Sequence, residues 1–375
     1  MRTTLGRTLA ITLAAGTVVA VAACSPPEKK DSAASSAGGA ATAAGAADLG
    51  GMDALVAAAK KEGQLNVIAL PPDWANYGEI IKAFGDKYGI KVNSAQPDGA
   101  SQDEINAANQ LKGQDKAPDV FDLSGAVATA NTAMFAPYKV STWADVPDSL
   151  KDAGGAWTND YGGYMSIGYD SAKVPAPTSV DDLLKPAYKG KVALNGDPTQ
   201  AGSAFGGVQM ASIANGGTVD DIARGVDFFG RLKKAGNFLP VDPTATTIES
   251  GQTPVVFDWD YLNAAESAKL KTWKVFVPTG AVLGSYYVQA INKDAPHPAA
   301  ARLWEEYLYS DEGQNLWLKG GARPVRADAM QKAGTLDATA FAALPKVEGT
   351  PVIPTQAQNT TAKEYLTANW AKTIG

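Results

Sequence analysis

The stretch LNVIALPPDWANYGEIIKAFGDKYGIKV, which spans residues 65–92, decides the fold class of this chain. Residues 65–70 are mostly apolar and predict a short buried strand, and Pro71-Pro72-Asp73 then supplies a stop and a helix N-cap. Residues 74–88 carry apolar side chains at helical spacing, and residues 90–95 predict a second strand. A strand, a helix and a strand in this order predict parallel pairing through a right-handed crossover.

The alternation continues into the next segment. Ser101-Gln102-Asp103-Glu104 has the spacing of a capping box at the start of a further helix, and residues 120–123 predict a third strand. These elements predict an α/β domain, in which ligand sites lie at the carboxyl ends of the strands. Those ends carry residues 71–74, 96–101 and 122–125.

A second α/β unit follows the glycine-containing segment at residues 159–164. Its predicted strands cover residues 164–169, 191–194, 255–259 and 273–277, and its predicted helices cover residues 179–184, a segment ending at 214, and 218–235. A strand at residues 286–291 is expected to return the chain to the first sheet, and helices near 298–309 and 311–318 close the body. The sequence therefore predicts two α/β lobes joined by crossing strands, with a hinge and a ligand cleft between them.

These patterns also predict the boundaries of the segments. We expect a signal peptide at residues 1–23, an unstructured Ala/Gly/Ser-rich linker at 24–51, one lobe at 52–163 and 284–375, and the other lobe at 164–283. The C-terminal part of the first lobe could pack on both lobes.

The first residues have the pattern of an export signal. Arg2 and Arg7 precede an apolar run at residues 9–20, which is too short for a permanent membrane-spanning helix. The run ends in Val21-Ala22-Ala23-Cys24, which resembles a bacterial lipobox and implies that the thiol of Cys24 is acylated. An ordinary secretory signal with an incidental cysteine is the alternative. We expect an extracytoplasmic protein that is lipid-anchored to the outer face of the cell membrane.

Composition limits the partners. The formal charge of the whole chain is -6, which leaves no basic face for nucleic acid, whose binding rests on neutralising phosphates. Cys24 is the single cysteine, so a lipidated chain has no disulfide to form. Beyond the signal, no apolar run in the sequence approaches membrane-spanning length, so we expect membrane contact through the lipid anchor alone.

Motifs that would indicate an enzyme are missing from the sequence. The single histidine, His297, lies between two prolines where a helix is expected to begin. The sequence contains no nucleophile elbow, Walker loop or histidine-rich metal spacing, and we expect no catalysis, no cofactor and no metal site. Asp258 and Asp260 lie two apart on a predicted strand, so alternation would place both on one face, where a like-charge pair could act catalytically. We favour one carboxylate binding ligand and the other capping or pairing; a structural or sensory lipoprotein is a further alternative.

Several segments, in order, resemble the extracellular solute-binding proteins of ABC importers, particularly the group that binds polyamines, thiamine, ferric iron or phosphonates. They are residues 74–77, 88–92, 183–192 with the string LLKPAYKGKV, 197–203 and 299–314. The resemblance covers roughly residues 63–330 and implies the type II periplasmic-binding-protein fold, in which two lobes close on a small ligand. It also implies a monomeric receptor that delivers a small molecule to a membrane permease powered by a separate ATPase.

Candidate ligand-binding residues gather at the predicted strand ends and at the crossover. They are Trp74, Tyr77 and Asp98 in the first lobe, Tyr161 and Tyr164 at the crossover, and Thr199, Gln200 and Ser203 at a helix N-terminus of the second lobe. Asp258, Trp259, Asp260 and Tyr261 end one buried strand, and Tyr286 and Tyr287 end the opposite one. Carboxylates among aromatic rings suit an organic cation, because the rings attract ammonium groups and an aspartate neutralises them.

The resemblance indicates which cation to expect. Trp74-x-x-Tyr77, Trp259 and Tyr286 or Tyr287 fall where polyamine binders stack rings on their ligand, but the neutral residue after their tryptophan is Asp260 here. A thiamine-like cation would use the same rings. Ferric iron is the alternative, since the adjacent Tyr286 and Tyr287 are hard oxygen donors, although iron binders place their tyrosine pair at the other strand. A phosphonate receptor of the same fold is a further alternative.

Overall fold

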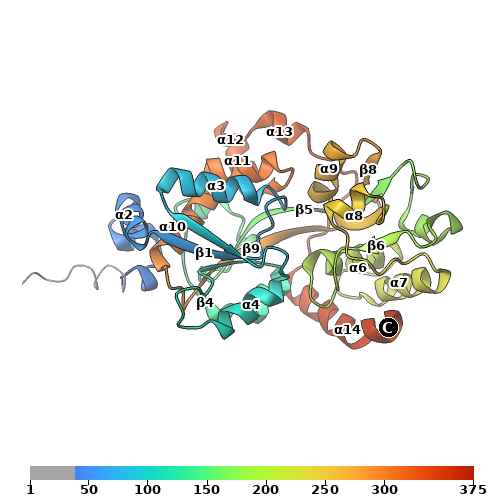
Figure 1. Ribbon diagram of the computed structural model, residues 1–375, viewed down its shortest axis with the longest axis horizontal. Coiled ribbons are helices and arrows are strands. Elements are labelled where there is room, and N and C mark those ends of the chain that lie inside the picture. The colour runs from blue at the N-terminus through green and yellow to red at the C-terminus, as the bar shows by residue number, and fades with distance from the viewer. Residues whose placement is uncertain (1–38) are drawn as a thin grey trace, which may run out of the picture.

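The computed structural model describes residues 39–375 as a mixed α/β protein (Figure 1). The predicted signal peptide, Cys24 and the first part of the predicted linker lie outside the described residues. The strands are β1 (Gln64–Ile68), β2 (Lys91–Ala95), β3 (Val120–Leu123), β4 (Phe135–Ala136), β5 (Thr158–Asp170), β6 (Val192–Leu194), β7 (Val255–Trp259), β8 (Trp273–Phe276), β9 (Gly284–Asn292) and β10 (Arg323–Pro324). The α-helices are α2 (Met52–Glu62), α3 (Tyr77–Tyr88), α4 (Ser101–Gln110), α5 (Gly125–Ala130), α6 (Gly202–Ala214), α7 (Ala223–Ala235), α8 (Ala245–Glu249), α9 (Asp260–Lys269), α10 (Pro298–Leu308), α11 (Asp311–Lys319), α12 (Ala327–Ala333), α13 (Ala338–Ala342) and α14 (Gln356–Ile374). Within residues 39–375, no helix is both long and apolar enough to cross a membrane.

We call lobe 1 the part built from β1–β4, α2–α5, α10 and α11. β1 and β2 pair in parallel and are connected through α3, as the sequence predicts. Leu65, Val67 and Ile68 of β1 are buried, which agrees with an apolar run covered on both faces. β3 pairs antiparallel with β9, so β9 returns the chain to lobe 1 as predicted for residues 286–291.

We call lobe 2 the part built from β6–β8 and α6–α9, on the right of Figure 1. Its central strand β7 pairs antiparallel with β5 and parallel with β6. α6 packs between β7 and α7, and its residues 203–212 are all buried. The predicted short helix at residues 179–184 is a 3-10 helix, Val180–Leu184.

Two strands, β5 and β9, connect the lobes. The first half of β5 pairs with β9 and β10, and the second half pairs with β7 and β8. β5 begins at Thr158, earlier than predicted, so the glycines of the crossover lie inside a strand. A Cβ on Gly162 would lie 2.2 Å from the carbonyl oxygen of Ser285, and one on Gly163 would lie 2.4 Å from Oδ1 of Asp260. Only glycine permits this close approach of backbone to neighbouring groups.

Residues 39–51 correct the predicted linker, because they are packed on lobe 1. Ala40 and Ala43 are buried, and Arg302 of α10 donates from Nε to the Ala43 carbonyl at 2.9 Å and from Nη2 to the Ala41 carbonyl at 2.9 Å. The segment has hardly any large apolar side chain, so composition alone predicted disorder. A buried arginine that satisfies its backbone carbonyls stabilises it instead.

Two helix starts also differ from the sequence prediction. Asp73 does not cap α3, because residues 73–76 form a turn in which Ala75 and Asn76 have φ of 46° and 71° and the helix begins at Tyr77. Ser101 is the first residue of α4, and its Oγ accepts a hydrogen bond from the backbone N–H of Ser124 at 3.0 Å. That bond fixes the start of α4 to the segment that follows β3.

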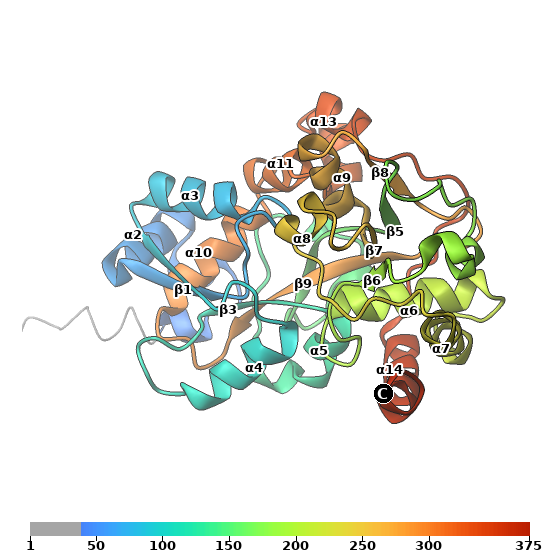
Figure 2. The same ribbon diagram turned by 45° about the vertical axis from the view of Figure 1, so that its right-hand side comes forward.

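The C-terminal helix α14 lies against both lobes. It packs on α7 of lobe 2 and on α5 of lobe 1, and the two views agree on its place below α7 (Figures 1 and 2). Ala362 and Leu366 are fully buried, and the Trp370 ring lies 5.6 Å from the Phe229 ring. It therefore contacts α5, the helix that follows β3 in the chain.

Candidate functional site

A cleft of about 820 Å³ lies between the lobes, at the carboxyl ends of β1, β2, β3, β6 and β7. Lobe 1 lines it with the loops after β1 and β2, the start of α4 and the end of β3. Lobe 2 lines it with residues 195–197 and 200–203, the segment around α8, the end of β7 and one face of α9. In Figure 2, β1, α3 and α4 lie to the left of this region, and α9, β6 and α6 lie to its right. We call it the interlobe cleft.

The charges that line the interlobe cleft are almost all negative. Nine carboxylates line it, and Lys269 is the one lysine or arginine among the described residues of its wall. The carboxylates are Asp73, Asp98, Asp103, Glu104, Asp122, Asp197, Asp242, Asp258 and Glu266. Both lobes contribute, so a cation held between them would meet negative charge on each side.

Asp122, at the end of β3, and Glu104 are the two most buried carboxylates that lobe 1 contributes to the cleft. The Asp122 carboxylate Oδ2 accepts a hydrogen bond from the Tyr161 hydroxyl at 2.9 Å, while its Oδ1 is buried and has no partner. Glu104 Oε2 accepts from the backbone N–H of Asp122 at 2.9 Å. Burial raises the pKa of Asp122 to about 7, and burial also raises the pKa of Glu104 well above its usual range.

Asp258, at the end of β7, is the corresponding group on the lobe 2 side. Its Oδ2 accepts from Asn195 Nδ2 and its Oδ1 accepts from the Trp259 backbone N–H, both at 2.8 Å. Burial raises the pKa of Asp258 to about 7. Nearby, Glu266 Oε1 lies 3.0 Å from Lys269 Nζ, and its Oε2 is buried without a partner.

Aromatic rings form the wall beside Asp122. Trp74 and Tyr287 line the cleft, with ring centroids 5.7 Å apart and edge to face. Trp74 Nε1 donates to the Tyr161 hydroxyl at 2.8 Å, and the Tyr161 ring stacks on Tyr287 at 5.5 Å. Because Tyr161 also donates to Asp122, one chain of hydrogen bonds fixes both a ring and a carboxylate of the cleft.

The lobe 1 loops hold strained backbone at the cleft. Among the described residues, the four non-glycine residues with positive φ are Ala69, Ala75, Asn76 and Gln96, all in the loops after β1 and β2. Such conformations cost about 1–3 kcal/mol each and gather at ligand sites, where they orient neighbouring groups.

Six of the residues predicted from sequence line the interlobe cleft. They are Trp74, Asp98, Gln200, Ser203, Asp258 and Tyr287. Ser203 is buried and donates from Oγ to the Asn195 carbonyl at 3.0 Å, so its hydroxyl proton is already used inside lobe 2.

Other predicted residues lie behind the cleft wall. Tyr77, Tyr161 and Tyr261 are almost fully buried, and the Tyr77 hydroxyl accepts from Gln289 at 2.9 Å. Thr199 donates its hydroxyl to Asp197 at 2.8 Å, and Tyr164 lies beneath the guanidinium of Arg323 at 4.6 Å. These side chains position their neighbours and do not line the cleft in this structure.

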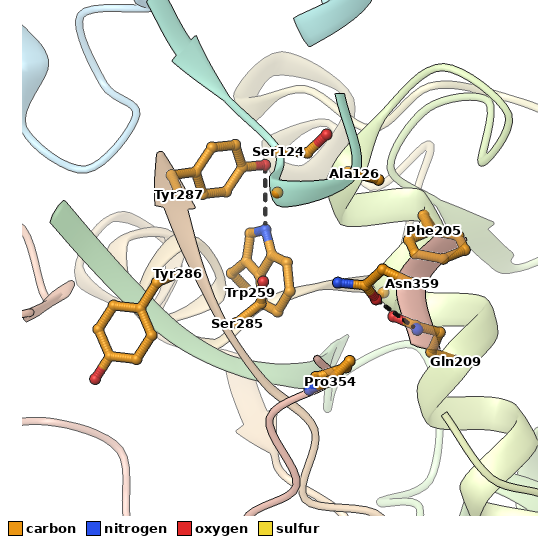
Figure 3. Close-up of a pocket in the computed structure, with 13 residues that line it drawn as sticks. Ser124, Ala126, Phe205, Gln209, Trp259, Ser285, Tyr286, Tyr287, Pro354 and Asn359 are labelled. Atoms are coloured by element: carbon orange, nitrogen blue, oxygen red, sulfur yellow. Dashed lines mark hydrogen bonds between the residues drawn. The ribbon is translucent and has the colours of Figure 1, made fainter. Parts of the chain in front are cut away.

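Trp259 lines a different, smaller cavity of about 30 Å³ on the far side of Tyr287 (Figure 3). Its side chain is 3% exposed, and its Nε1 donates to the Tyr287 hydroxyl at 3.5 Å. Tyr286 and Tyr287 also border this cavity, and their hydroxyls point apart in Figure 3. A paired tyrosine site is therefore not formed by these two neighbours.

Asp260 is separated from Asp258, so the same-face prediction for these two residues is wrong. β7 ends at Trp259, and Asp260 is the first residue of α9, which breaks the alternation. Asp260 is fully buried, with Oδ2 paired to Arg323 Nη1 at 2.5 Å and Oδ1 accepting from the Tyr164 backbone N–H at 2.9 Å. Its charge is neutralised inside the protein.

The sequence reasoning found Asp98 and Asp258 but missed other carboxylates of the cleft wall, among them Asp122, Glu104 and Glu266. Asp122 stands at a predicted strand end, so that rule could have found it. Glu104 belongs to a predicted helix whose buried face could not be assigned, and Glu266 lies on α9, which was not predicted. Within residues 39–375, no group of three or more His, Cys, Asp or Glu side chains is placed to hold a metal ion.

Two α/β lobes, two connecting strands and a polar cleft define a periplasmic-binding-protein fold of the second type. The sequence model of the family described as bacterial extracellular solute-binding protein matches residues 116–345, more than half of the chain. The chain belongs to that family. It is thus a solute-binding protein, of a family whose members work outside the cytoplasm.

Solved structures agree with the fold. The periplasmic binding protein AfuA from Actinobacillus pleuropneumoniae, with fructose-6-phosphate bound, shares 16% identity over 83% of this chain and 98% of that chain, with a TM-score of 0.63. Apo ferric ion-binding protein A from Pasteurella haemolytica shares 18% identity over 83% and 98%, with a TM-score of 0.60. Iron-bound HitA from Pseudomonas aeruginosa shares 21% identity over 81% and 97%, with a TM-score of 0.58. The comparison with curated protein sequences gives no match.

Proposed function

We propose that this protein captures a small organic cation, of the polyamine or thiamine-like kind, in the interlobe cleft and delivers it to a membrane permease. In this proposal the receptor is a monomer, lipidated at Cys24, and works at the outer face of the cell membrane. The permease draws its energy from a separate ATPase, so the receptor needs no cofactor.

The observation that carries the proposal is the excess of carboxylates in the cleft wall, nine against the single Lys269. Two of these carboxylates, Asp122 and Asp258, line the cleft from opposite lobes and are only 7% and 8% exposed. A buried carboxylate without a cation is costly, and a ligand ammonium would remove that cost. Trp74 and Tyr287 beside Asp122 supply aromatic rings, whose faces attract cations.

The same charges disfavour an anionic ligand. The helix N-terminus of α6, at residues 199–203, has the backbone donors that an anion prefers. However, Asp197 and Asp258 line the cleft beside it, and Ser203 already donates to backbone. Anion binding there would bring like charges together.

Ferric iron is the alternative that the sequence left open. Tyr286 and Tyr287 are the tyrosine neighbours considered for it, and their hydroxyls point apart (Figure 3). The ferric-binding neighbours are below 25% identity, so they support the fold and do not choose the ligand.

Titration calorimetry tests the proposal with spermidine, thiamine, aminoethylphosphonate and ferric citrate. We expect an organic cation to bind most tightly. We also expect Trp74→Ala to weaken that binding by about thirtyfold, because truncating an aromatic anchor costs about 2 kcal/mol.

Trp143→Ala is the matched control. Trp143 is half-buried on lobe 1 beside Lys139 and Lys151, away from the cleft lining, so cation affinity should stay as in the wild type. Tighter binding of the phosphonate or of ferric citrate than of either cation would overturn the proposal.

A further inference from the structure

The carboxyl group of Asp122 is buried in the wall of the interlobe cleft. It lines the interlobe cleft and is 7% exposed. Its Oδ1 is buried and accepts no well-formed hydrogen bond, although the nearby Tyr77 hydroxyl opposes the rise in its pKa. The Glu104 carboxylate touches its backbone N–H at 2.9 Å. Two acids are thus buried side by side at the cleft wall.

Among residues 39–375, the titratable groups that face Asp122 are acids and phenols. Each element packed around it contributes such groups, which are Glu104 from α4, Tyr77 from α3, Asp160 and Tyr161 from β5, Tyr261 from α9, Tyr287 from β9, and Glu305 and Tyr309 from α10 and its end. Among residues 39–375, no lysine, arginine or histidine forms an ion pair with Asp122 or Glu104. The pair therefore has no counter-charge within the described protein.

Burial without a counter-charge favours the protonated form of such a pair. Burial raises the pKa of Asp122 to about 7, so below that pH the group is mostly the neutral acid. Burial also raises the pKa of Glu104 well above its usual range. A protonated carboxyl donates one hydrogen bond and carries no charge, which removes the penalty of burying an anion.

We propose that cation capture in this cleft is an exchange, in which the Asp122–Glu104 pair releases a proton to solvent and takes the ligand's positive charge in its place. This inference rests on the proposed function and adds its proton dependence. In the exchange, the O–H bond of the carboxyl group breaks, the proton passes to buffer, and an ammonium N–H of the ligand donates to the freed oxygen. No oxidation or covalent bond to the ligand is involved.

The exchange sets the sign of the pH dependence. A bound cation lowers the pKa of the pair, so below pH 7 binding releases a proton and affinity rises with pH. The rise is about tenfold per pH unit for each proton released. Burial also raises the pKa of Asp258, which faces Glu266, to about 7. Both of its carboxylate oxygens already accept hydrogen bonds, and any proton that it releases on binding would add to the number released by the pair.

Calorimetry with spermidine at pH 6, in two buffers of different ionisation enthalpy, counts the protons released on binding. Amine groups of this kind stay charged between pH 5 and 7, so the released proton comes from the protein. We expect about one proton or more for the wild type, and affinity about a hundredfold higher at pH 7 than at pH 5. Asp122→Asn keeps the shape of the side chain and should lower the count by about one and flatten the affinity profile.

Asp98→Asn is the control, because Asp98 is an exposed carboxylate of the same cleft. It should weaken spermidine binding by its charge alone and leave the proton count unchanged. Spermidine binding without proton release, or an unchanged count in Asp122→Asn, would overturn this inference and leave the proposed function standing. No binding of spermidine at any pH, together with failure of the other cations, would overturn both.

Discussion

Burial gives different roles to the two aspartates on either side of Trp259. Asp258 faces the interlobe cleft, while Asp260 is sealed against Arg323 and the backbone of Tyr164. Burial raises the pKa of Asp260, and the nearby Arg323 charge opposes that rise. Asp260 is therefore an internal partner of Arg323, and its substitution should affect stability more than ligand affinity.

Arg323→Met should lower the free energy of unfolding by about 3–5 kcal/mol, because it leaves Asp260 as an unpaired buried charge. The loss should be larger at pH 8 than at pH 5, since the folded-state pKa of Asp260 would rise further and stability is lost as pH rises through it. Denaturant unfolding at the two pH values measures this. Asp260→Asn combined with Arg323→Met should recover part of the loss.

Lys82→Met is the control, because the Lys82–Asp86 pair is more than half exposed on both sides. Its loss should cost less than about 1 kcal/mol. An Arg323→Met protein as stable as the Lys82→Met protein at pH 8 would contradict the role given to the Asp260–Arg323 pair.

At the scale of elements, the connecting strands depend on close backbone contact. β5 passes β9 where Gly162 faces Ser285, and this pairing joins the two lobes. The glycines of the crossover were visible in the sequence, but the strand around them was not, because polar residues interrupt the apolar pattern there.

Gly162→Ala should destabilise the protein by several kcal/mol, because its Cβ would lie 2.2 Å from the Ser285 carbonyl oxygen and 2.8 Å from the Tyr286 ring. Gly280→Ala is the control, since no atom lies within 4 Å of a Cβ at that position. Thermal unfolding compares the two. Equal melting temperatures for the Gly162→Ala and Gly280→Ala proteins would contradict this prediction, because they would mean that β5 and β9 can move apart at Gly162 without loss of stability.

How far the sequence predicts an element depends on whether its signal is local. β1, α3 and β2 were predicted because apolar runs, helical spacing and turn residues agree over a short stretch. α9 was missed because it follows β7 without a loop, so the apolar strand pattern seemed to continue through Tyr261. α14 carries Ala362, Leu366 and Trp370 at a spacing of four, which is a helical signal, but its packing on both lobes depends on contacts with distant α5 and α7.

The candidate site was predictable in kind and only partly in detail. The strand-end rule placed Trp74, Asp98 and Asp258 correctly in the cleft. It could not show that the Trp259 ring packs against Gly206 of α6. A Cβ at Gly206 would lie 3.0 Å from that ring, so the absence of a side chain there makes room for it. Burial against a partner distant in sequence decides such cases.

At the scale of the whole molecule, two lobes joined by β5 and β9 enclose a cleft with carboxylates on both sides. A ligand that contacts both lobes binds the closed arrangement more tightly than the open one and so shifts the molecule toward closure. An acidic cleft adds selection by charge, because the same approach of the lobes that holds a cation would force an anion against buried carboxylates.

Native mass spectrometry tests the central claim most directly. The purified protein is incubated at pH 7 with an equimolar mixture of organic cations (spermidine and thiamine), anions (fructose-6-phosphate and aminoethylphosphonate), ferric citrate and a neutral sugar. The account predicts that the retained mass corresponds to an organic cation, and that Asp122→Asn retains less of it. Retention of a phosphate, of iron or of the neutral sugar in place of the cations, or retention of none of the mixture, would contradict the account.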